Sequence, residues 1–577
     1  MKPLDIINRA HQLQKQGELQ QAKVLLLTLI QSAPEHHSAW SLLANIHQSL
    51  NEDTQSKEAQ KQFEMIAWFN QQLDLANSYF QKNDLQRAEN ITQELLKLVK
   101  NEFRALILLG KIAFRVGDLQ TYSAIALHNI QLNKTKPAVH NAYAEALYYT
   151  KQFSPLVHFY KDTQHLGSFS QHAKSLVAAA YVKQMAFKEA SDLYTTLLRE
   201  NYHPSLCYLR LGNIEKILGN SEKAISYYHQ ALTITPNLGE AYWSLANLKT
   251  YVFSKTEITN LVEQLKQAVN NLNTAQLHFS LAKAYDQNKS YHEAFKQLQS
   301  GNNIHKQLTP YKKNQFQQRC IKFITPSLLK ELPKPTTDYS HLIFIVSLPR
   351  SGSTLVEQII ASHPNVDASY ELTEINAIAQ ELEANNINST VPYNLNNLNQ
   401  AQVAKYAQRY LDFIKPLRGS NQYFIDKQPI NFNHIGLIKT LFPNAKIIDV
   451  RREKEAIAWS LYKHSFSEGH NYSYDLQDLA SHINEHKELM AHWHLLYPGS
   501  MHILNYENII NNFESTINEL LTYCGLESNK QCYEFYNNQR PVLTPSSEQV
   551  RKPIYKEALT DWRNYAEYLA PLIKSLK

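Results

Sequence analysis

The turn from Pro349 to Thr354 has a composition that suits the binding of a phosphate group. It reads Pro-Arg-Ser-Gly-Ser-Thr and follows an apolar run over 342–346. Apolar residues at helical spacing come next, with Thr354 placed as an N-cap. In a strand–turn–helix unit the backbone N–H groups of the turn face one concavity, and the helix dipole adds partial positive charge there. The stretch therefore predicts an anion site that contains Arg350.

The turn does not meet the rule for nucleoside triphosphates. The P-loop pattern G-x-x-x-x-G-K-[ST] requires a glycine five residues before Gly352 and a lysine directly after it. The chain has Ser347 and Ser353 at these two places. An ATPase or GTPase is therefore disfavoured, and so is a small-molecule kinase.

Two further cations follow segments that are expected to be strands. Lys427 comes after the apolar segment 423–425, and Arg452 comes after 445–450. Strands that alternate with helices predict a parallel sheet covered on both faces, and ligands of such sheets bind outside the carboxyl ends of the strands. We expect Arg350, Lys427 and Arg452 on one rim. The other expected elements are helices over 435–441 and 453–462 and a strand over 501–504.

The turn closely resembles the phosphosulfate-binding loop of sulfotransferases that use 3'-phosphoadenosine 5'-phosphosulfate. In that family a Pro-Arg-Ser-Gly-[ST]-[ST] loop follows the first strand. Later segments resemble the family in the same order: the Val-Arg-Arg of 450–452 with Ser460, the Tyr-Glu pair at 506–507, and the late loop 546–553 followed by Trp562. The donor-binding residues implied by this resemblance are Arg350, Ser351, Gly352, Ser353, Thr354, Arg452, Ser460, Tyr506, Ser546, Gln549, Val550 and Lys552.

The resemblance also implies the catalytic residues. Sulfonate transfer should be like phosphoryl transfer, in which negative charge grows on the bridging oxygen, and Arg350 and Lys427 are the candidates to stabilise it. In tyrosylprotein sulfotransferases the base is a Glu 21 residues after the loop arginine, which is Glu371 here. The cytosolic type uses a His two residues after the lysine, where this chain has Pro429. Two alternatives stay open: Glu371 as a helix-start carboxylate and Lys427 as a positioning residue only.

Three positions depart from the family pattern. Thr373 replaces an Arg two residues after the base, and His464 replaces an Arg four residues after the serine. Asp561 replaces the Lys before the late Trp. A separate signal is His482-Ile483-Asn484-Glu485-His486, which matches the H-x-x-E-H signature of a metalloprotease. The chain has 24 histidines, so such a match arises easily, and we expect no metal.

The first half of the chain shows a repeat with a period of 34 residues. Two consecutive units share their small and large residues, and this pattern resembles the tetratricopeptide repeat, in which paired antiparallel helices stack into a superhelix. We expect an α-solenoid of seven to eight repeats over residues 1–305. The residues that define the pattern are Tyr208, Leu211, Gly212, Ala224, Tyr228, Ala231, Pro236, Tyr242, Leu245 and Ala246.

The repeat array has two interpretations. Its concave groove would hold a peptide or protein, or the array would be a spacer or dimerisation scaffold. The aromatic residues Tyr227, Tyr228, Tyr242 and Trp243 are expected in the repeat core. After a proline-punctuated connecting segment at 306–340, the second half, 341–577, is expected to be an α/β domain with a mainly parallel sheet.

Composition indicates the class of protein and its compartment. The chain has 577 residues, a formal charge of +6 and only 14 glycines, which favours two or three domains rich in helix. Four cysteines without metal spacing suit the cytoplasm. No apolar signal core or membrane-length apolar run is present, so we expect no membrane insertion.

The sequence thus predicts a sulfotransferase that uses 3'-phosphoadenosine 5'-phosphosulfate, with a hydroxyl acceptor for which protein tyrosine is a candidate. We expect a protein or peptide acceptor held by the repeats, and no nucleic acid partner. The alternative is a repeat scaffold with a catalytically inactive nucleotide-binding domain.

Overall fold

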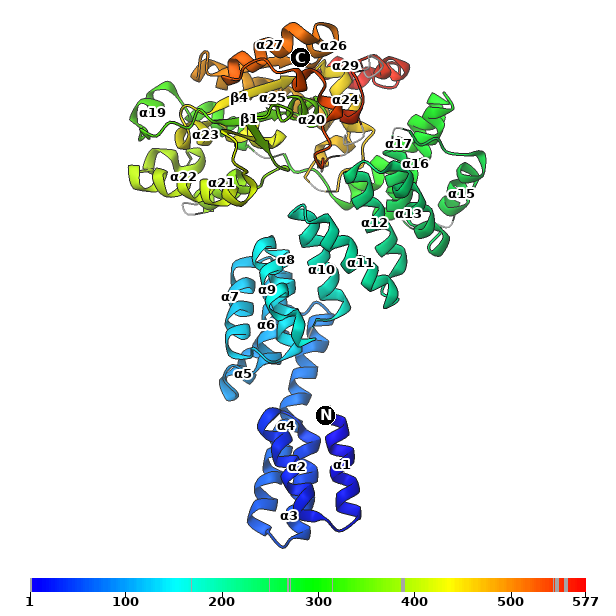
Figure 1. Cartoon of the computed structure of the whole chain (residues 1–577), viewed down its shortest axis with the longest axis vertical. Helices are drawn as coiled ribbons and strands as arrows, with labels where there is room; N and C mark the ends of the chain where they lie inside the picture. The colour runs from blue at the N-terminus through cyan, green and yellow to red at the C-terminus, as the bar shows by residue number, and fades with distance from the viewer. Residues whose placement is uncertain are drawn as a thin grey trace. The chain divides into compact units, whose positions relative to one another are not determined.

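The protein is described here by a computed structural model, shown in Figure 1. It describes residues 3–167, 169–248, 250–266, 269, 271–313, 315–384, 390–467, 469–542, 544, 549–554 and 559–577. The chain forms two compact units, 1–197 and 198–577. The second unit contains the last repeat helices together with the α/β domain. The boundaries that we predicted near 305 and 341 stay predictions.

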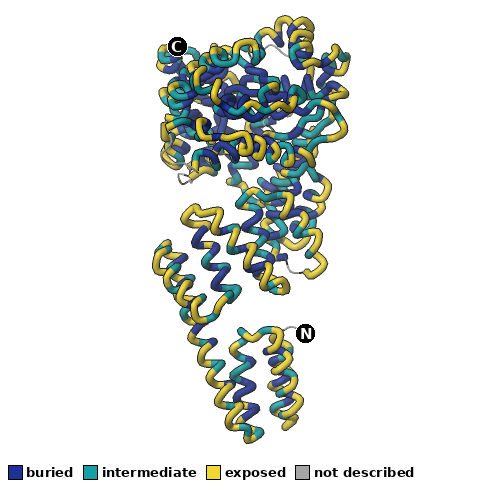
Figure 2. The backbone as a smooth tube through the Cα atoms, turned by 90° about the vertical axis from the view of Figure 1, so that its left-hand side faces the viewer, coloured by how far each residue is buried: buried dark blue, intermediate teal, exposed yellow. Residues whose placement is uncertain are grey.

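The first unit is built of helices joined by short turns. Several of its helices begin with an acidic cap: Asp84, Glu102 and Asp118 accept hydrogen bonds from backbone N–H groups three residues on. The α-helices have a buried stripe and an exposed face, as Figure 2 shows. The helices are α1 (Pro3–Lys15), α2 (Leu19–Ser32), α3 (His37–Ser49), α4 (Asp53–Gln81), α5 (Leu85–Leu98), α6 (Phe103–Val116), α7 (Leu119–Leu132), α8 (Pro137–Tyr149), α9 (Phe153–Thr163), η1 (Gln164–Leu166), α10 (Gln171–Lys183) and α11 (Phe187–Arg199).

Helix α4 departs from the regular repeat pattern, because its 29 residues run without a turn. Its N-terminal part contributes Ala59 to a hydrophobic core shared with α1, α2 and α3. Its C-terminal part contributes Phe69 and Leu73 to a different core, shared with α5 and α6. One helix therefore contributes to two hydrophobic cores.

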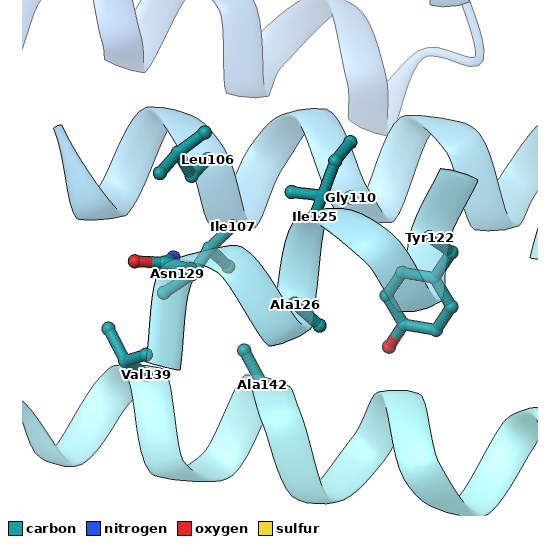
Figure 3. Close-up of a pocket in the computed structure, with 9 residues that line it drawn as sticks. All are labelled: Leu106, Ile107, Gly110, Tyr122, Ile125, Ala126, Asn129, Val139 and Ala142. Atoms are coloured by element: carbon teal, nitrogen blue, oxygen red, sulfur yellow. The ribbon is translucent and has the colours of Figure 1, made fainter. Parts of the chain in front are cut away.

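A narrow recess lies between α6, α7 and α8 in the first unit (Figure 3). Its lining is almost entirely apolar. The amide of Asn129 is already used, because it donates to the carbonyl oxygen of Phe103 at 2.9 Å and accepts from Asn133. The recess is a packing gap between helices.

The repeat pattern is confirmed in the first helices of the second unit. Gly212 of α12 lies against the fully buried ring of Tyr228 in α13, and a Cβ at Gly212 would lie 2.6 Å from that ring. Tyr242 is buried as expected, and Trp243 is partly buried against Phe279. The helices are α12 (Pro204–Leu218), α13 (Ser221–Ile234), α14 (Gly239–Ala246), α15 (Lys255–Lys266), α16 (Leu272–Gln287) and α17 (Tyr291–Leu308).

The proline-punctuated connecting segment contains two short helices. It forms α18 (Phe316–Phe323) and α19 (Pro326–Glu331). Pro326 starts α19 at a position where a missing N–H costs nothing, and Thr325 caps the helix. Cys320 and Ile324 are fully buried in the core of the α/β domain, so the segment belongs to that core.

The α/β domain is built on a five-stranded, fully parallel sheet with the order β2-β3-β1-β4-β5. Alternate residues of β1 face opposite sides. Phe344 packs with α22 (Gln400–Ile414), α23 (Ile435–Leu441) and α25 (Leu476–Leu496). Ile343 and Ile345 pack with α20 (Ser353–Ile360), α26 (Tyr506–Asn511) and α27 (Phe513–Cys524). Figure 1 shows helices on both faces of the sheet. The strands are β1 (Leu342–Ser347), β2 (Val366–Ala368), β3 (Tyr423–Lys427), β4 (Lys446–Arg451) and β5 (Met501–Asn505).

The strands and helices that we expected in this domain are confirmed to within two residues at each end. Strand β2 was missed, because three residues are too few for a periodic signal. The helices are α20 (Ser353–Ile360), α21 (Glu374–Ala384), α22 (Gln400–Ile414), α23 (Ile435–Leu441), α24 (Lys454–Tyr462), α25 (Leu476–Leu496), α26 (Tyr506–Asn511), α27 (Phe513–Cys524), α28 (Lys530–Tyr533) and α29 (Ala570–Ser575), with short helices η2 (Pro392–Asn397), η3 (Lys415–Leu417), η4 (Pro429–His434), η5 (Asn471–Tyr474), η6 (Phe535–Asn537), η7 (Gln549–Arg551) and η9 (Asp561–Tyr565).

None of the described helices has the length and apolar character that crossing a bilayer requires.

The contact between Gly212 and Tyr228 gives a stability prediction. Gly212→Ala should lower the free energy of unfolding by about 1–3 kcal/mol, because the added methyl group overlaps a fully buried ring. The measurement is thermal and urea unfolding followed by circular dichroism.

Gly110→Ala in α6 is the matched control, since its Cβ would meet Tyr122 at 3.4 Å and the helix gains propensity. The packing explanation is wrong if both substitutions have the same effect.

Candidate active site

The turn between β1 and α20 presents unused backbone donors. Arg350 and Gly352 both have left-handed backbone conformations, with φ of 70° and 102°. Within the described chain, the N–H groups of Ser351 to Thr354 have no hydrogen-bond acceptor. The hydroxyl of Ser351 is also buried without a partner. Such a concave set of donors at a helix start is suited to an anion.

The helix start itself differs from our expectation. The N-cap of α20 is Gly352, and Thr354 lies inside the helix, so the prediction of Thr354 as N-cap is wrong. The reason is steric. The backbone of Gly352 passes so close to Tyr506 that a Cβ there would lie 2.5 Å from the ring, and the left-handed conformation again favours glycine. The hydroxyl of Thr354 lies 3.3 Å from that of Thr544.

Four of the predicted donor-binding side chains converge beside this turn. The Nε of Arg350 donates to the hydroxyl of Ser460 in α24 at 3.3 Å. Arg452, directly after β4, donates to the carbonyl oxygen of Arg350 at 3.1 Å, and its guanidinium lies 4.9 Å from the ring centre of Tyr506. Both cations thus lie on the rim where we expected them, because β1 and β4 are neighbours.

The predicted base and cation form an ion pair at the end of β3. The Nζ of Lys427 donates to Oε1 of Glu371 at 2.6 Å. The lysine side chain is 1% exposed, whereas that of Glu371 is 44% exposed. Burial lowers the pKa of Lys427, but the charges of Glu371 and Glu357 outweigh burial and raise it overall. Lys427 therefore keeps its proton while Glu371 remains accessible.

Sequence reasoning missed the other partners of Lys427. Glu357 of α20 is 2% exposed and places Oε2 at 3.6 Å from Nζ of Lys427. Its Oε1 pairs with Arg540 at 2.8 Å. Glu357 sits within an apolar run of the helix, and a charged residue in such a place is a signal that could have been noticed. Arg540 has no local pattern that marks it.

The predicted late loop is described only in part. Ser546 lies outside the described residues. Gln549 and Val550 belong to η7, where Val550 is buried, and Lys552 is exposed. The described contacts do not bring these three side chains to Arg350. Between Val550 and Lys552, Arg551 instead reaches repeat helix α12, where it donates to the carbonyl oxygen of Ile217 at 3.0 Å.

The positions that depart from the family pattern have their own environments. Thr373 is exposed just before α21. His464 is buried between Phe466 and Trp243 of α14, at ring-centre distances of 4.6 and 5.3 Å. Asp561 lies 3.7 Å from Lys463, so an acidic residue at this place has a cation beside it.

The H-x-x-E-H segment lies in α25 and packs into the core. His482 stacks on Tyr472 and His486 packs against Phe432. Burial lowers the pKa of the two imidazoles to about 3 and about 4, so both are neutral near pH 7. Glu485 pairs with Lys313. In the described part of the chain, no group of three His, Cys, Asp or Glu residues is placed to hold a metal ion.

Comparison with protein families identifies the class of the second domain. Residues 343–530 match the model of the sulfotransferase family. These residues include the β1–α20 turn, Glu371, Lys427, Arg452 and Ser460. The chain therefore carries a sulfotransferase-family domain in its C-terminal part. Residues 210–336, which cover the last repeat helices, match the model of the plant-specific mitochondrial import receptor subunit TOM20.

A curated relative shares more of the chain. An uncharacterized protein of Aquifex aeolicus (strain VF5) is 32% identical over 402 residues, covering 67% of this chain. The match spans about half the length of that relative, 52%.

Solved structures resemble each half. The sulfotransferase domain from the Synechococcus PCC 7002 olefin synthase covers 42% of this chain and 98% of its own, with 19% identity and a TM-score of 0.27. Pseudomonas aeruginosa PilF covers 41% of this chain and 93% of its own, with 16% identity and a TM-score of 0.20. With scores this low, the family conclusion rests on the match to the family model.

The geometry of Gly352 gives a second prediction. Gly352→Ala should lower the free energy of unfolding by about 1–3 kcal/mol from backbone strain alone, and by more because of the overlap with Tyr506. Urea unfolding measures the effect.

Gly499→Ala is the control for strain without overlap, since φ there is 69° and nothing lies within 4 Å of its Cβ. Equal losses in the two variants would show that the contact with Tyr506 does not matter.

Proposed function

We propose that this protein is a sulfotransferase that moves a sulfonate group from 3'-phosphoadenosine 5'-phosphosulfate to a hydroxyl group, with tyrosine of a protein or peptide as the favoured acceptor. The observation that carries the proposal is the arrangement at the carboxyl edge of the sheet. Unused N–H donors, Arg350 and Arg452 lie at the ends of β1 and β4, and the pair of Lys427 and Glu371 lies at the end of β3.

On the donor side the anion-binding groups have separate tasks. The N–H groups of the turn would hold the 5'-phosphosulfate, as helix starts hold anions. Arg452 and Ser460 would hold the 3'-phosphate. Arg350 touches Ser460 and comes from the turn, so it lies between the two places. Positive charge on this side matches a donor that carries several negative charges.

On the acceptor side Glu371 is the proposed base. Its Oε1 is bound to Lys427, and its exposed side chain leaves Oε2 for the acceptor hydroxyl. The hydroxyl oxygen attacks sulfur while Glu371 takes the proton. The bond from sulfur to the bridging oxygen breaks, and its electron pair remains on that oxygen. Lys427 and Arg350 stabilise the charge that develops there.

The role of the repeats is part of the same proposal. Repeat arrays of this type form extended concave surfaces, which suit a protein or peptide acceptor. The cytoplasm is the proposed compartment, because all four cysteines are buried and unpaired, as expected of a reducing environment.

The first test is calorimetry with the desulfonated donor product, 3'-phosphoadenosine 5'-phosphate. The wild-type protein should bind it, and Arg452→Ala should weaken binding by roughly 2 kcal/mol through loss of a charge-assisted contact. Arg418→Ala is the control, because the hydrogen bonds of its guanidinium group within the described chain go to carbonyl oxygens of its own loop. Absence of wild-type binding at high micromolar concentration would refute the donor assignment.

The second test concerns the base. Glu371→Gln should keep the affinity for the product nucleotide and lower turnover by roughly 10²–10⁴-fold, because only proton removal is lost. Transfer from labelled donor to a tyrosine peptide measures turnover, and a serine peptide and a small phenol identify the acceptor class. Wild-type rates in the variant would exclude Glu371 as the base.

A further inference from the structure

Glu357 links the proposed catalytic lysine to an arginine close to the end of the chain. One carboxylate oxygen lies 3.6 Å from Nζ of Lys427, and the other lies 2.8 Å from Nη2 of Arg540. The carboxylate is 3% exposed, and the side chain of Arg540 is 17% exposed. Pairs that are this buried are screened little by salt, so each partner fixes the position of the next.

Arg540 is held at a second point. Its Nε donates to Oε1 of Gln358, the residue after Glu357, at 2.8 Å. Gln358 is fully buried and also donates to the carbonyl oxygen of Asn538 at 3.1 Å. The guanidinium group of Arg540 therefore contacts two consecutive side chains of α20. These two contacts fix its orientation toward the carboxylate of Glu357.

Arg551 ties this arrangement to the repeat array. Its Nη2 donates both to the carbonyl oxygen of Arg540, at 3.1 Å, and to that of Ile217, at 3.0 Å. Ile217 lies in the last turn of α12, where carbonyl groups have no partner within the helix and a cation is favoured. Gly219 permits this close approach because it has no side chain: a Cβ there would lie 2.9 Å from Nε of Arg551.

We propose that Glu357 and Arg540 are positioning residues for Lys427, and that Arg551 makes this positioning depend on repeat helix α12. The proposal rests on the proposed function, in which Lys427 stabilises the charge on the bridging oxygen. An ammonium group between two carboxylates has two possible places. Arg540 partly neutralises the charge of Glu357. The attraction between Glu357 and Lys427 is therefore weaker, and Lys427 stays paired with Glu371.

Charge removal at the two positions should have opposite effects on Lys427. The charged groups that act on it are Glu371, Glu357, Arg540 and Asp426. Glu357→Gln removes a negative charge and lowers the pKa of Lys427, whereas Arg540→Gln removes a positive charge and raises it. Asp426 is common to all the variants: burial raises its pKa to about 7, so it titrates below the alkaline limb, and Tyr410 donates to it.

The experiment compares kcat, KM for the donor and the pH profile of kcat in Glu357→Gln, Arg540→Gln and Arg551→Gln. Each of the first two should lower kcat roughly ten- to a hundredfold while the affinity for 3'-phosphoadenosine 5'-phosphate changes less than threefold. In Glu357→Gln the alkaline loss of activity should begin about one pH unit lower than in the wild-type protein. In Arg540→Gln it should begin at the wild-type pH or above it.

Arg319→Gln is the matched control, because it removes an arginine–carboxylate pair with Glu383 in the same domain, away from the site. The positioning role would be overturned if the alkaline loss of activity began at the same pH in all variants. It would also be overturned if Glu357→Gln and Arg540→Gln lowered kcat no more than Arg319→Gln does. Thermal unfolding identifies variants that simply fail to fold, and Arg540→Lys should then restore part of kcat.

The dependence on α12 is tested by a double-mutant cycle. If Arg551 acts through Arg540 and Glu357, the combination of Arg551→Gln with Glu357→Gln should lower kcat less than the product of the single effects. Independent effects would confine the proposal to Glu357 and Arg540, and would refute the link to the repeats.

A failure of the proposed function is separable from a failure of this inference. If the wild-type protein neither binds the product nucleotide nor transfers sulfonate, the function is wrong. Hydrogen exchange then decides the inference without activity: Arg540→Gln and Arg551→Gln should both speed exchange at the end of β3, around Lys427, compared with Arg319→Gln. Unchanged exchange there would refute it.

Discussion

The burial of the Lys427 ammonium group is the constraint on which the carboxyl edge of the sheet depends. A charge that is 1% exposed is unstable unless nearby groups replace its hydration. Here Glu371 precedes α21, Glu357 belongs to α20, and Arg540 lies more than a hundred residues further along the chain. Two segments must therefore be in place before the lysine is satisfied, and a third before Glu357 has its own partner Arg540. The assembled edge is thus a product of the complete domain.

The two sides of this edge differ in electrostatic character. Beside the β1–α20 turn, Arg350 and Arg452 add charge to backbone donors that remain unused. At the end of β3, by contrast, the cation is balanced by carboxylates on either side. The first place therefore favours a multiply charged anion, whereas the second does not, because its cation is already balanced by carboxylates.

Local sequence patterns predicted much of the fold and the candidate site, because they depend on neighbours in the chain. The strand–turn–helix around Gly352 and helix 435–441 are examples. Partners that meet only in three dimensions were missed: Arg540 carries no local signal, and the role of Arg551 depends on a carbonyl group of α12. The N-cap of α20 was misplaced because the ring of Tyr506, which requires glycine there, is distant in sequence.

Helix α4 has a consequence for how the repeat array is able to change in evolution. Its two ends belong to different hydrophobic cores, and its 29 residues span about 43 Å as one continuous helix. Insertion of a single residue between Ala59 and Phe69 would rotate one core relative to the other by about 100°. Turns between the other helices absorb such changes, whereas α4 does not. Length variation in the first unit should therefore be tolerated in the turns and excluded from the middle of this helix.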